Sequence, residues 1–197
     1  MPYVAPSPLD YDAQRRALVS AVALGTGLPP GQVIIMEGET MGLPRPRAPY
    51  VGIQVMAASV KMGFDWCTPV VDAPGDPTGL HRFEGPRSLS VSFDSFGRTH
   101  EEAYGVMAAF QAALEYPPVA DLLAGAGLAV WDIGAVGDIS DELATTYEGR
   151  ANLEVTFGAN ASTVIDLGRI DMVPVSGTVS PGIQISAIVG PLTPKRP

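Results

Sequence analysis

The 197-residue chain has little from which a catalytic or metal site could be built. Its single cysteine, Cys67, excludes an intrachain disulfide and a thiolate metal cage. Its two histidines, His81 and His100, belong to no metal-binding motif. A GxSxG nucleophile elbow, a Walker sequence and a recognisable acid/base pair of carboxylates are also missing. We therefore expect no catalytic residue, no metal and no cofactor, and we predict that Cys67 is buried and inert.

The chain also has few charged residues. Charged residues make up 17% of the chain, the net charge is −9, and twelve basic residues are all it has. Tight binding to nucleic acid needs a basic field that replaces phosphate counterions, so this composition argues against it. Because 46% of the residues are hydrophobic, so thin a charged coat indicates that contacts between subunits cover part of the surface. No stretch approaches the 18 or more apolar residues of a membrane helix, so we expect no membrane partner.

The spacing of the apolar residues predicts a single α+β domain over 1–197. Helices are predicted at 10–24, 99–116 and 119–124, and Thr99 with Glu102 forms a capping box at the start of the second. Strands are predicted at 32–36, 50–56, 87–95, 128–133, 146–157, 163–173 and 183–189. Strands in hairpin order with grouped helices favour a mixed or mainly antiparallel sheet with the helices packed on one face. Residues 56–86 are predicted to form a long protruding hairpin or loop.

Two segments have the composition of docking elements. Three prolines in Gly42–Pro49 preset an extended path, so residues 43–60 are expected to form an arm or strand that contacts a neighbouring subunit. Residues 72–79 contain two prolines and two glycines and are predicted to be a loop. We expect this loop to dock on a neighbouring protein through its flank, with Leu80, Arg82 and Phe83 as anchors. An exposed hairpin tip without a partner is the alternative.

Several short pieces resemble the neck terminator, or tail-terminator-like, proteins of tailed bacteriophages. They occur in order over most of the chain: the amphipathic first helix that ends in Gly25-Thr26-Gly27-Leu28, then Pro44-Arg45-Pro46-Arg47-Ala48-Pro49-Tyr50, Phe96-Gly97 before the long helix, Asp138-Ile139-Ser140, and Tyr147-Glu148-Gly149-Arg150-Ala151. The segment 56–86 has no counterpart in the resemblance.

The resemblance implies a structural virion protein made in the host cytoplasm, with a sheet flanked by helices. Such subunits form a ring, commonly a homo-hexamer, between the phage connector or adaptor and the tail tube or sheath, and DNA passes through the lumen without tight binding. It places the interface at Pro44, Arg45, Pro46, Pro49, Tyr50 and Arg150. For Arg150, an intersubunit ion pair and a solvated face remain open. The alternatives are a tail-tube or minor tail protein and a small hydrolase or carbohydrate-binding domain.

Overall fold

Three helices and a mixed sheet form the first of two units into which the contacts divide the chain. This unit contains Met1–Trp66 and Glu84–Thr163, and the second contains Cys67–Phe83 and Val164–Pro197. The structure is a computed structural model that describes residues 9–36, 44–69, 80–143, 146–166, 173–179 and 183–189.

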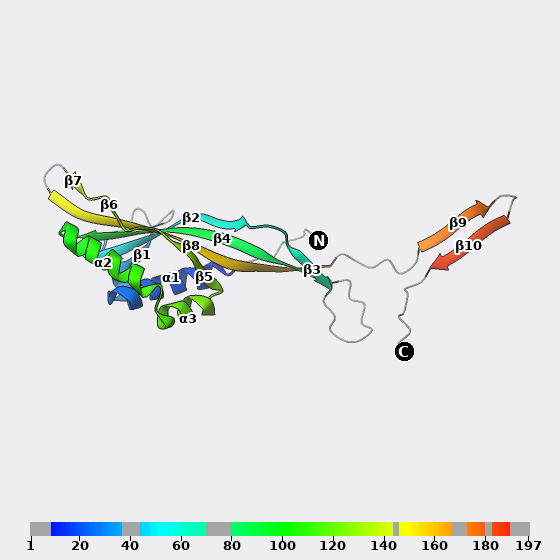
Figure 1. Cartoon of the computed structure of the whole chain (residues 1–197), viewed down its shortest axis with the longest axis horizontal. Helices are drawn as coiled ribbons and strands as arrows, with labels where there is room; N and C mark the ends of the chain where they lie inside the picture. The colour runs from blue at the N-terminus through cyan, green and yellow to red at the C-terminus, as the bar shows by residue number, and fades with distance from the viewer. Residues whose placement is uncertain are drawn as a thin grey trace. The chain divides into compact units, whose positions relative to one another are not determined.

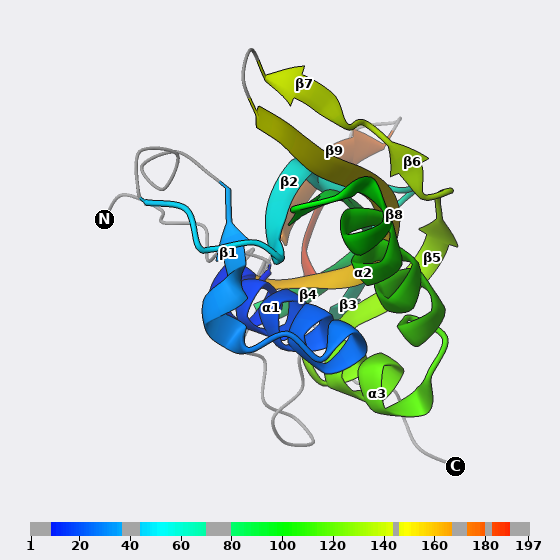
Figure 2. The ribbon, with the colours of Figure 1, turned by 90° about the vertical axis from the view of Figure 1, so that its left-hand side faces the viewer.

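The helices begin and end where local sequence signals place them. Helix α1 (Tyr11–Thr26) is capped by the Asp10 carboxylate, which accepts a hydrogen bond from the Ala13 nitrogen at 2.9 Å. It ends at Gly27, whose φ of 73° lies in the left-handed region that favours glycine. In helix α2 (His100–Ala113), the Thr99 hydroxyl accepts from the Glu102 nitrogen at 3.2 Å. Helix α3 (Pro117–Gly125) follows, and α1 packs against both α2 and α3 (Figure 2).

The sheet runs in the order β1-β2-β4-β8-β5, and the helices lie on one face of it (Figure 1). The bounds of these strands are β1 (Val33–Ile35), β2 (Tyr50–Lys61), β4 (Leu80–Gly97), β8 (Thr146–Asp166) and β5 (Leu128–Ile133). Strand β1 is parallel to β2, whereas β2 and β4, and β5 and β8, are antiparallel. The short strands β6 (Gly137–Asp138) and β7 (Asp141–Leu143) pair with β8. The predicted α+β class with a mixed sheet is confirmed.

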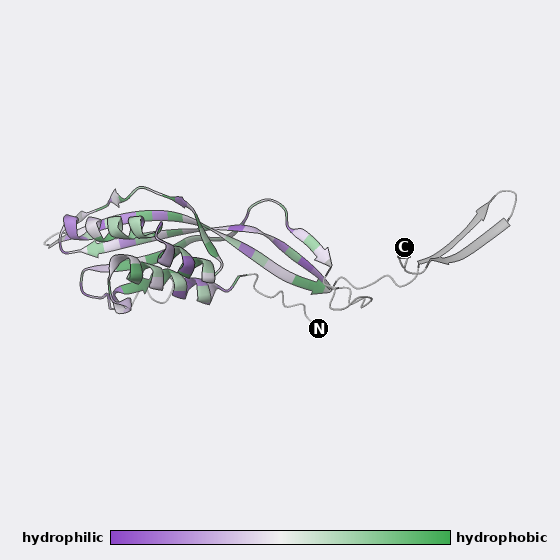
Figure 3. Cartoon of the chain, turned by 60° about the horizontal axis from the view of Figure 1, so that its bottom comes forward, coloured by the Kyte–Doolittle hydropathy of each residue, from purple (hydrophilic) through white to green (hydrophobic). Residues whose placement is uncertain are grey.

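The core lies between the helices and the sheet. Leu89, Val91 and Phe93 alternate along β4 and are buried, as their spacing predicts. The Phe93 ring lies 4.8 Å from that of Phe110 in α2 and 6.5 Å from that of Phe157 in β8, measured between centroids. The resulting alternation of hydrophobic and hydrophilic residues along the strands is visible in Figure 3. Burying each such side chain stabilises the fold by about 1.5–3 kcal/mol.

Three strands extend further than their patterns predict. Strand β2 continues to Lys61 through register shifts after Val55 and Ala57, which interrupt the alternation that marks a strand in the sequence. Strand β4 begins at Leu80 instead of 87. Strand β8 joins the predicted strand 146–157 to the first part of the predicted strand 163–173. Between the two, Gly158 lies beneath the Trp131 indole, where a Cβ would overlap the ring.

The remaining strands add one pairing to the large sheet and form a separate two-stranded sheet. Strand β3 (Trp66–Pro69) pairs with β4, and β9 (Val173–Val179) pairs antiparallel with β10 (Ile183–Val189). Strand β10 has the predicted bounds, while β9 lies beyond the predicted strand 163–173. The predicted loop 72–79 falls outside the described residues. Among the helices of the described ranges, none is both long and apolar enough to cross a membrane.

Candidate assembly interface

Three of the predicted interface residues converge on one aromatic ring. Tyr50 at the start of β2 pairs in register with Phe96 on β4, and their rings stack with centroids 4.5 Å apart. The guanidinium carbon of Arg150 lies 4.8 Å from the Phe96 centroid, and that of Arg45 lies 5.7 Å from it. Both distances are in the range of cation–π attraction. We call Arg45, Tyr50, Phe96 and Arg150 the arginine–aromatic cluster.

The polar atoms of this cluster are poorly supplied with partners. Tyr50 is only 3% exposed, and its hydroxyl makes no hydrogen bond of good geometry within the described part of the chain, although Arg45 lies close enough to affect it. Burial raises the pKa of Tyr50 above its ordinary value, and the positive charge of Arg45 opposes this shift. The Nε of Arg150 is likewise buried and unpaired among those residues. The guanidinium of Arg150 contacts the face of the Phe96 ring.

A turn of the chain positions the backbone of Arg150. The Asp138 carboxylate accepts hydrogen bonds from the nitrogen and the hydroxyl of Ser140, at 2.9 and 2.6 Å. The Arg150 nitrogen donates to the Ser140 hydroxyl at 3.0 Å, and the Ile139 nitrogen donates to the Arg150 carbonyl at 3.1 Å. The Ser140 hydrogen bonds, with a smaller effect of His100, lower the pKa of Asp138. The sequence Asp138-Ile139-Ser140 thus joins the β6 segment to β8 beside the cluster.

Gly149 allows β8 to approach the start of α2. A Cβ at this position would overlap the carbonyl group of Thr99 and lie 2.7 Å from the His100 nitrogen. These are backbone atoms, so rotation of a side chain cannot relieve the overlap. The glycine in Glu148-Gly149-Arg150 is therefore required by packing, and it places Arg150 over Phe96.

The remaining predicted interface residues lie outside this cluster. Pro44 is exposed, and Pro46 and Pro49 are partly buried in the segment that leads into β2. Arg82 and Phe83 lie on β4 within the second unit, where Arg82 is exposed and Phe83 partly buried. Phe96 was missed as a site residue, although Phe96-Gly97 belongs to the resemblance.

A stretch of exposed apolar side chains was also missed by the sequence analysis. Large hydrophobic residues between positions 56 and 66 are exposed to water: Met56, Val60, Met62, Phe64 and Trp66. Phe64 is 90% exposed. The sequence Met62-Gly63-Phe64-Asp65-Trp66 could have indicated this surface. It is rich in large apolar residues but lies beyond the part of β2 in which apolar and polar residues alternate. We call residues 56–66 the apolar hairpin arm.

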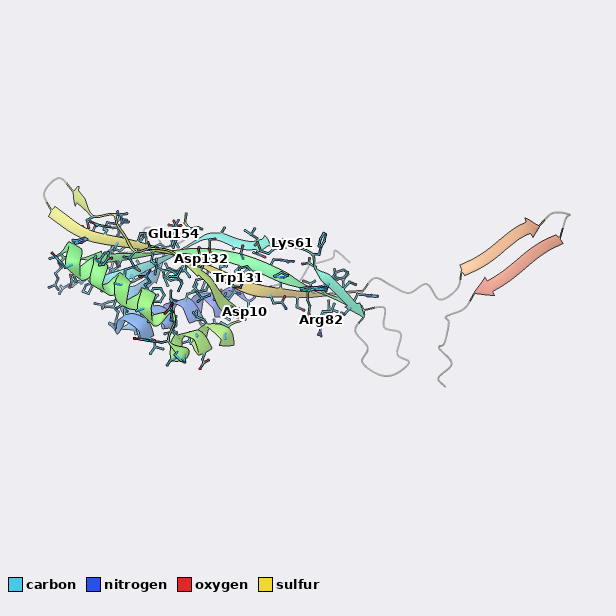
Figure 4. All side chains as sticks on the ribbon, in the orientation of Figure 1. Asp10, Lys61, Arg82, Trp131, Asp132 and Glu154 are labelled. Carbon is cyan, nitrogen blue, oxygen red and sulfur yellow. The ribbon has the colours of Figure 1, made fainter. Side chains whose placement is uncertain are left out.

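Ionic contacts hold the end of this arm in place. Asp65 Oδ1 accepts from Arg87 at 2.7 Å, and Asp65 Oδ2 accepts from Lys61 at 2.9 Å. These two partners, Arg87 first, lower the pKa of Asp65 to about 2. The Met62 nitrogen donates to the Pro86 carbonyl at 3.1 Å, which ties the turn to β4. Figure 4 labels Lys61 at the end of β2, beyond the helices.

Among the hollows on the first unit, two are lined mainly by apolar groups. The α1 hollow, of about 320 Å³, is bounded by Tyr11, Gln14, Arg15 and Leu18 of α1 and floored by Val55, Ala58 and Leu89 of the sheet. The tryptophan groove, of about 390 Å³, is lined by Trp66, Pro86, Leu128, Trp131 and Gly158, among others. Trp131 is labelled on β5 in Figure 4. Both hollows are mostly apolar, which suits contacts with protein side chains.

The prediction for Cys67 is wrong in one respect, because this cysteine is exposed. Its Sγ lies 3.5 Å from His81 Nδ1 across the β3–β4 pair. Cys67 is exposed on the paired strand β3, whereas the apolar Trp66 beside it in the sequence had suggested that it would be buried. Within the described ranges, no three His, Cys, Asp or Glu side chains gather as a group that could hold a metal ion.

Comparison with known proteins identifies the family. Residues 12–182 match the family described as phage neck terminator protein. The chain belongs to the phage neck terminator protein family. A search of curated proteins found no match to it. The suspected resemblance is thus confirmed, and the matched residues include the segment 56–86 and the whole arginine–aromatic cluster. As a neck terminator, the protein is a structural component of the phage neck in the virion, where it associates with other head–tail proteins.

Proposed function

We propose that copies of this neck terminator form a closed ring, a homo-hexamer, at the head–tail junction. The observation that carries the proposal is the apolar hairpin arm, which a lone subunit leaves in water although ionic contacts hold its end in a defined position. Contiguous exposed apolar surface of this kind marks a protein–protein interface. The small charged fraction, 17%, agrees with a surface that is partly covered in the assembly.

The ring joins the connector or adaptor to the tail tube or sheath and lets DNA pass. Its role is mechanical, with no catalytic step. The net charge of −9 supports passage without tight binding, since a cationic lumen would hold phosphates through counterion release. The proline segment before β2 serves as an arm toward the neighbouring subunit, and the segment around Arg82 and Phe83 serves as a docking element for another neck or tail protein.

Mass measurement in solution together with negative-stain imaging tests the ring. The expected result is a mass six times that of the 20.6 kDa chain and particles with a central hole. A purely monomeric protein at micromolar concentration, or tubes of open length as a tail-tube protein would form, contradicts the proposal.

The proline arm has a separate test. Replacing Pro44, Pro46 and Pro49 by glycine is expected to weaken assembly, because flexible residues lose more entropy on ordering at an interface. The far-ultraviolet circular dichroism of the dilute monomer should stay unchanged. A ring that assembles as tightly as wild type would rule out a role for the arm.

A further inference from the structure

The turn that carries Phe64 is held by contacts of the residues on either side of it. Asp65 bridges Lys61 and Arg87, and the Met62 nitrogen is bonded to the Pro86 carbonyl. Gly85 makes room for this arrangement, since a Cβ there would overlap the Asp65 carboxylate. Because the turn is held in this way, the 90% exposed phenyl ring can enter a partner with little further loss of backbone entropy.

The α1 hollow offers a site of matching chemistry on the same chain. Its floor is apolar, and its volume of about 320 Å³ exceeds the ~150 Å³ of an apolar cavity that binds benzene. Gln14, which lines it, is 4% exposed, and its Oε1 has no hydrogen-bond partner among the residues that the structure describes. A buried carbonyl oxygen without a donor costs roughly 1–3 kcal/mol, so a partner group that brings an N–H to Gln14 Oε1 would gain from binding there.

The Phe64 turn of the same molecule is held elsewhere. The hollow is floored by Val55, Ala58 and Leu89, whereas the turn is fixed to Pro86 and Arg87 at the end of the hairpin. Phe64 is also almost fully exposed in its own subunit. The ring and the hollow are therefore two distinct surfaces of one chain, which is the condition for head-to-tail contacts that close into a ring.

We infer that Phe64 of one subunit inserts into the α1 hollow of the next, and that a backbone N–H of the inserted turn donates to Gln14 Oε1. This inference rests on the proposed ring and names its interface. The occupant is a second copy, because every chain carries both the exposed Phe64 ring and the α1 hollow. In a closed ring of identical subunits, each phenyl ring then has one hollow to enter. Burial of an aromatic side chain removes about 150–250 Å² from water, and the neighbouring Met56, Val60 and Met62 extend the contact toward the size of a stable interface.

Site-directed disulfide formation tests the pairing directly. In the full-length chain with Cys67→Ser, one protein carries Phe64→Cys and another carries Ala58→Cys on the floor of the hollow. Mixing and mild oxidation should give a crosslinked heterodimer, because a disulfide requires Cα atoms within about 7 Å. The matched control replaces Ala58→Cys by Ala129→Cys, which lines the tryptophan groove. Crosslinking of Phe64→Cys to this control, and not to Ala58→Cys, would overturn the inference.

Association measurements supply a second readout. Phe64→Ser should raise the concentration at half-assembly at least tenfold, and Phe64→Leu should restore most of the loss. Gln14→Leu should weaken assembly while raising the thermal stability of the dilute monomer, since it removes the unpaired oxygen. If wild type forms rings but these variants assemble equally well and no crosslink to Ala58→Cys forms, this inference fails and the proposed ring stands. A monomeric wild type would defeat both.

Discussion

Gly149→Ala is the substitution whose cost follows most directly from the structure. The added Cβ would overlap the Thr99 carbonyl group and approach the His100 nitrogen to 2.7 Å. All of these atoms belong to the backbone at the start of α2, so either β8 or the helix terminus must shift. Forcing a methyl group into a packed site typically costs 1–3 kcal/mol, and the lack of any movable side chain places this case at about 3 kcal/mol.

The expected loss can be read from thermal unfolding. For a chain of this length, 1 kcal/mol corresponds to roughly 2–4 °C in Tm, so Gly149→Ala should unfold roughly 6–12 °C below wild type. Far-ultraviolet circular dichroism at one fixed protein concentration is the suitable assay, because assembly makes Tm depend on concentration.

Gly105→Ala is the matched control. Gly105 is exposed in the interior of α2, and a Cβ there would meet no atom within 4 Å. Alanine should therefore raise stability by about 0.5–1 kcal/mol through its higher helix propensity. If Gly149→Ala unfolds within 2 °C of wild type, β8 and the start of α2 do not approach as closely as described, and the packing argument for Glu148-Gly149-Arg150 is refuted.

Three further measurements test Asp65, Cys67 and the contact between Arg150 and Phe96. Because the pKa of Asp65 is lowered to about 2, its ionic contacts stabilise the turn above the ordinary carboxyl pKa of about 3.9 and are lost as the pH falls from about 4 to 2. A nuclear magnetic resonance titration of the Asp65 carboxyl should therefore have its midpoint near 2, and a midpoint near 4 would contradict the bridge to Lys61 and Arg87. Cys67 should react with a thiol reagent under native conditions about as fast as a free thiol, and protection from labelling would show that it is covered. A double-mutant cycle of Arg150→Ala and Phe96→Leu in urea unfolding should give a coupling of about 0.5–2 kcal/mol, whereas strict additivity would exclude the cation–π contact.

Local patterns in the sequence were sufficient for the helices and for the fold class. Thr99 caps α2 as predicted, because a cap depends only on neighbours along the chain, and Asp10 caps α1 in the same way. The alternation along residues 87–95 identified the central strand, since the period of two is a property of the strand itself. The order of short motifs was also enough to indicate the family, which the match over 12–182 confirms.

The convergence of the interface residues required the tertiary structure. Arg45 and Arg150 are far apart in the sequence, and only the pairing of β2 with β4 and the approach of β8 to α2 bring them to Phe96. The sequence supplied the residue types but gave no sign that Phe96 is their common partner.

Exposure was likewise decided by long-range packing. Cys67 follows the apolar Trp66 and was predicted to be buried, yet it is exposed, and the Phe64 side chain is 90% exposed as well. Whether an apolar residue is buried depends on what the rest of the chain places over it. The sequence by itself therefore determined the elements and the family of this protein, and the tertiary structure decided which apolar side chains remain free for assembly.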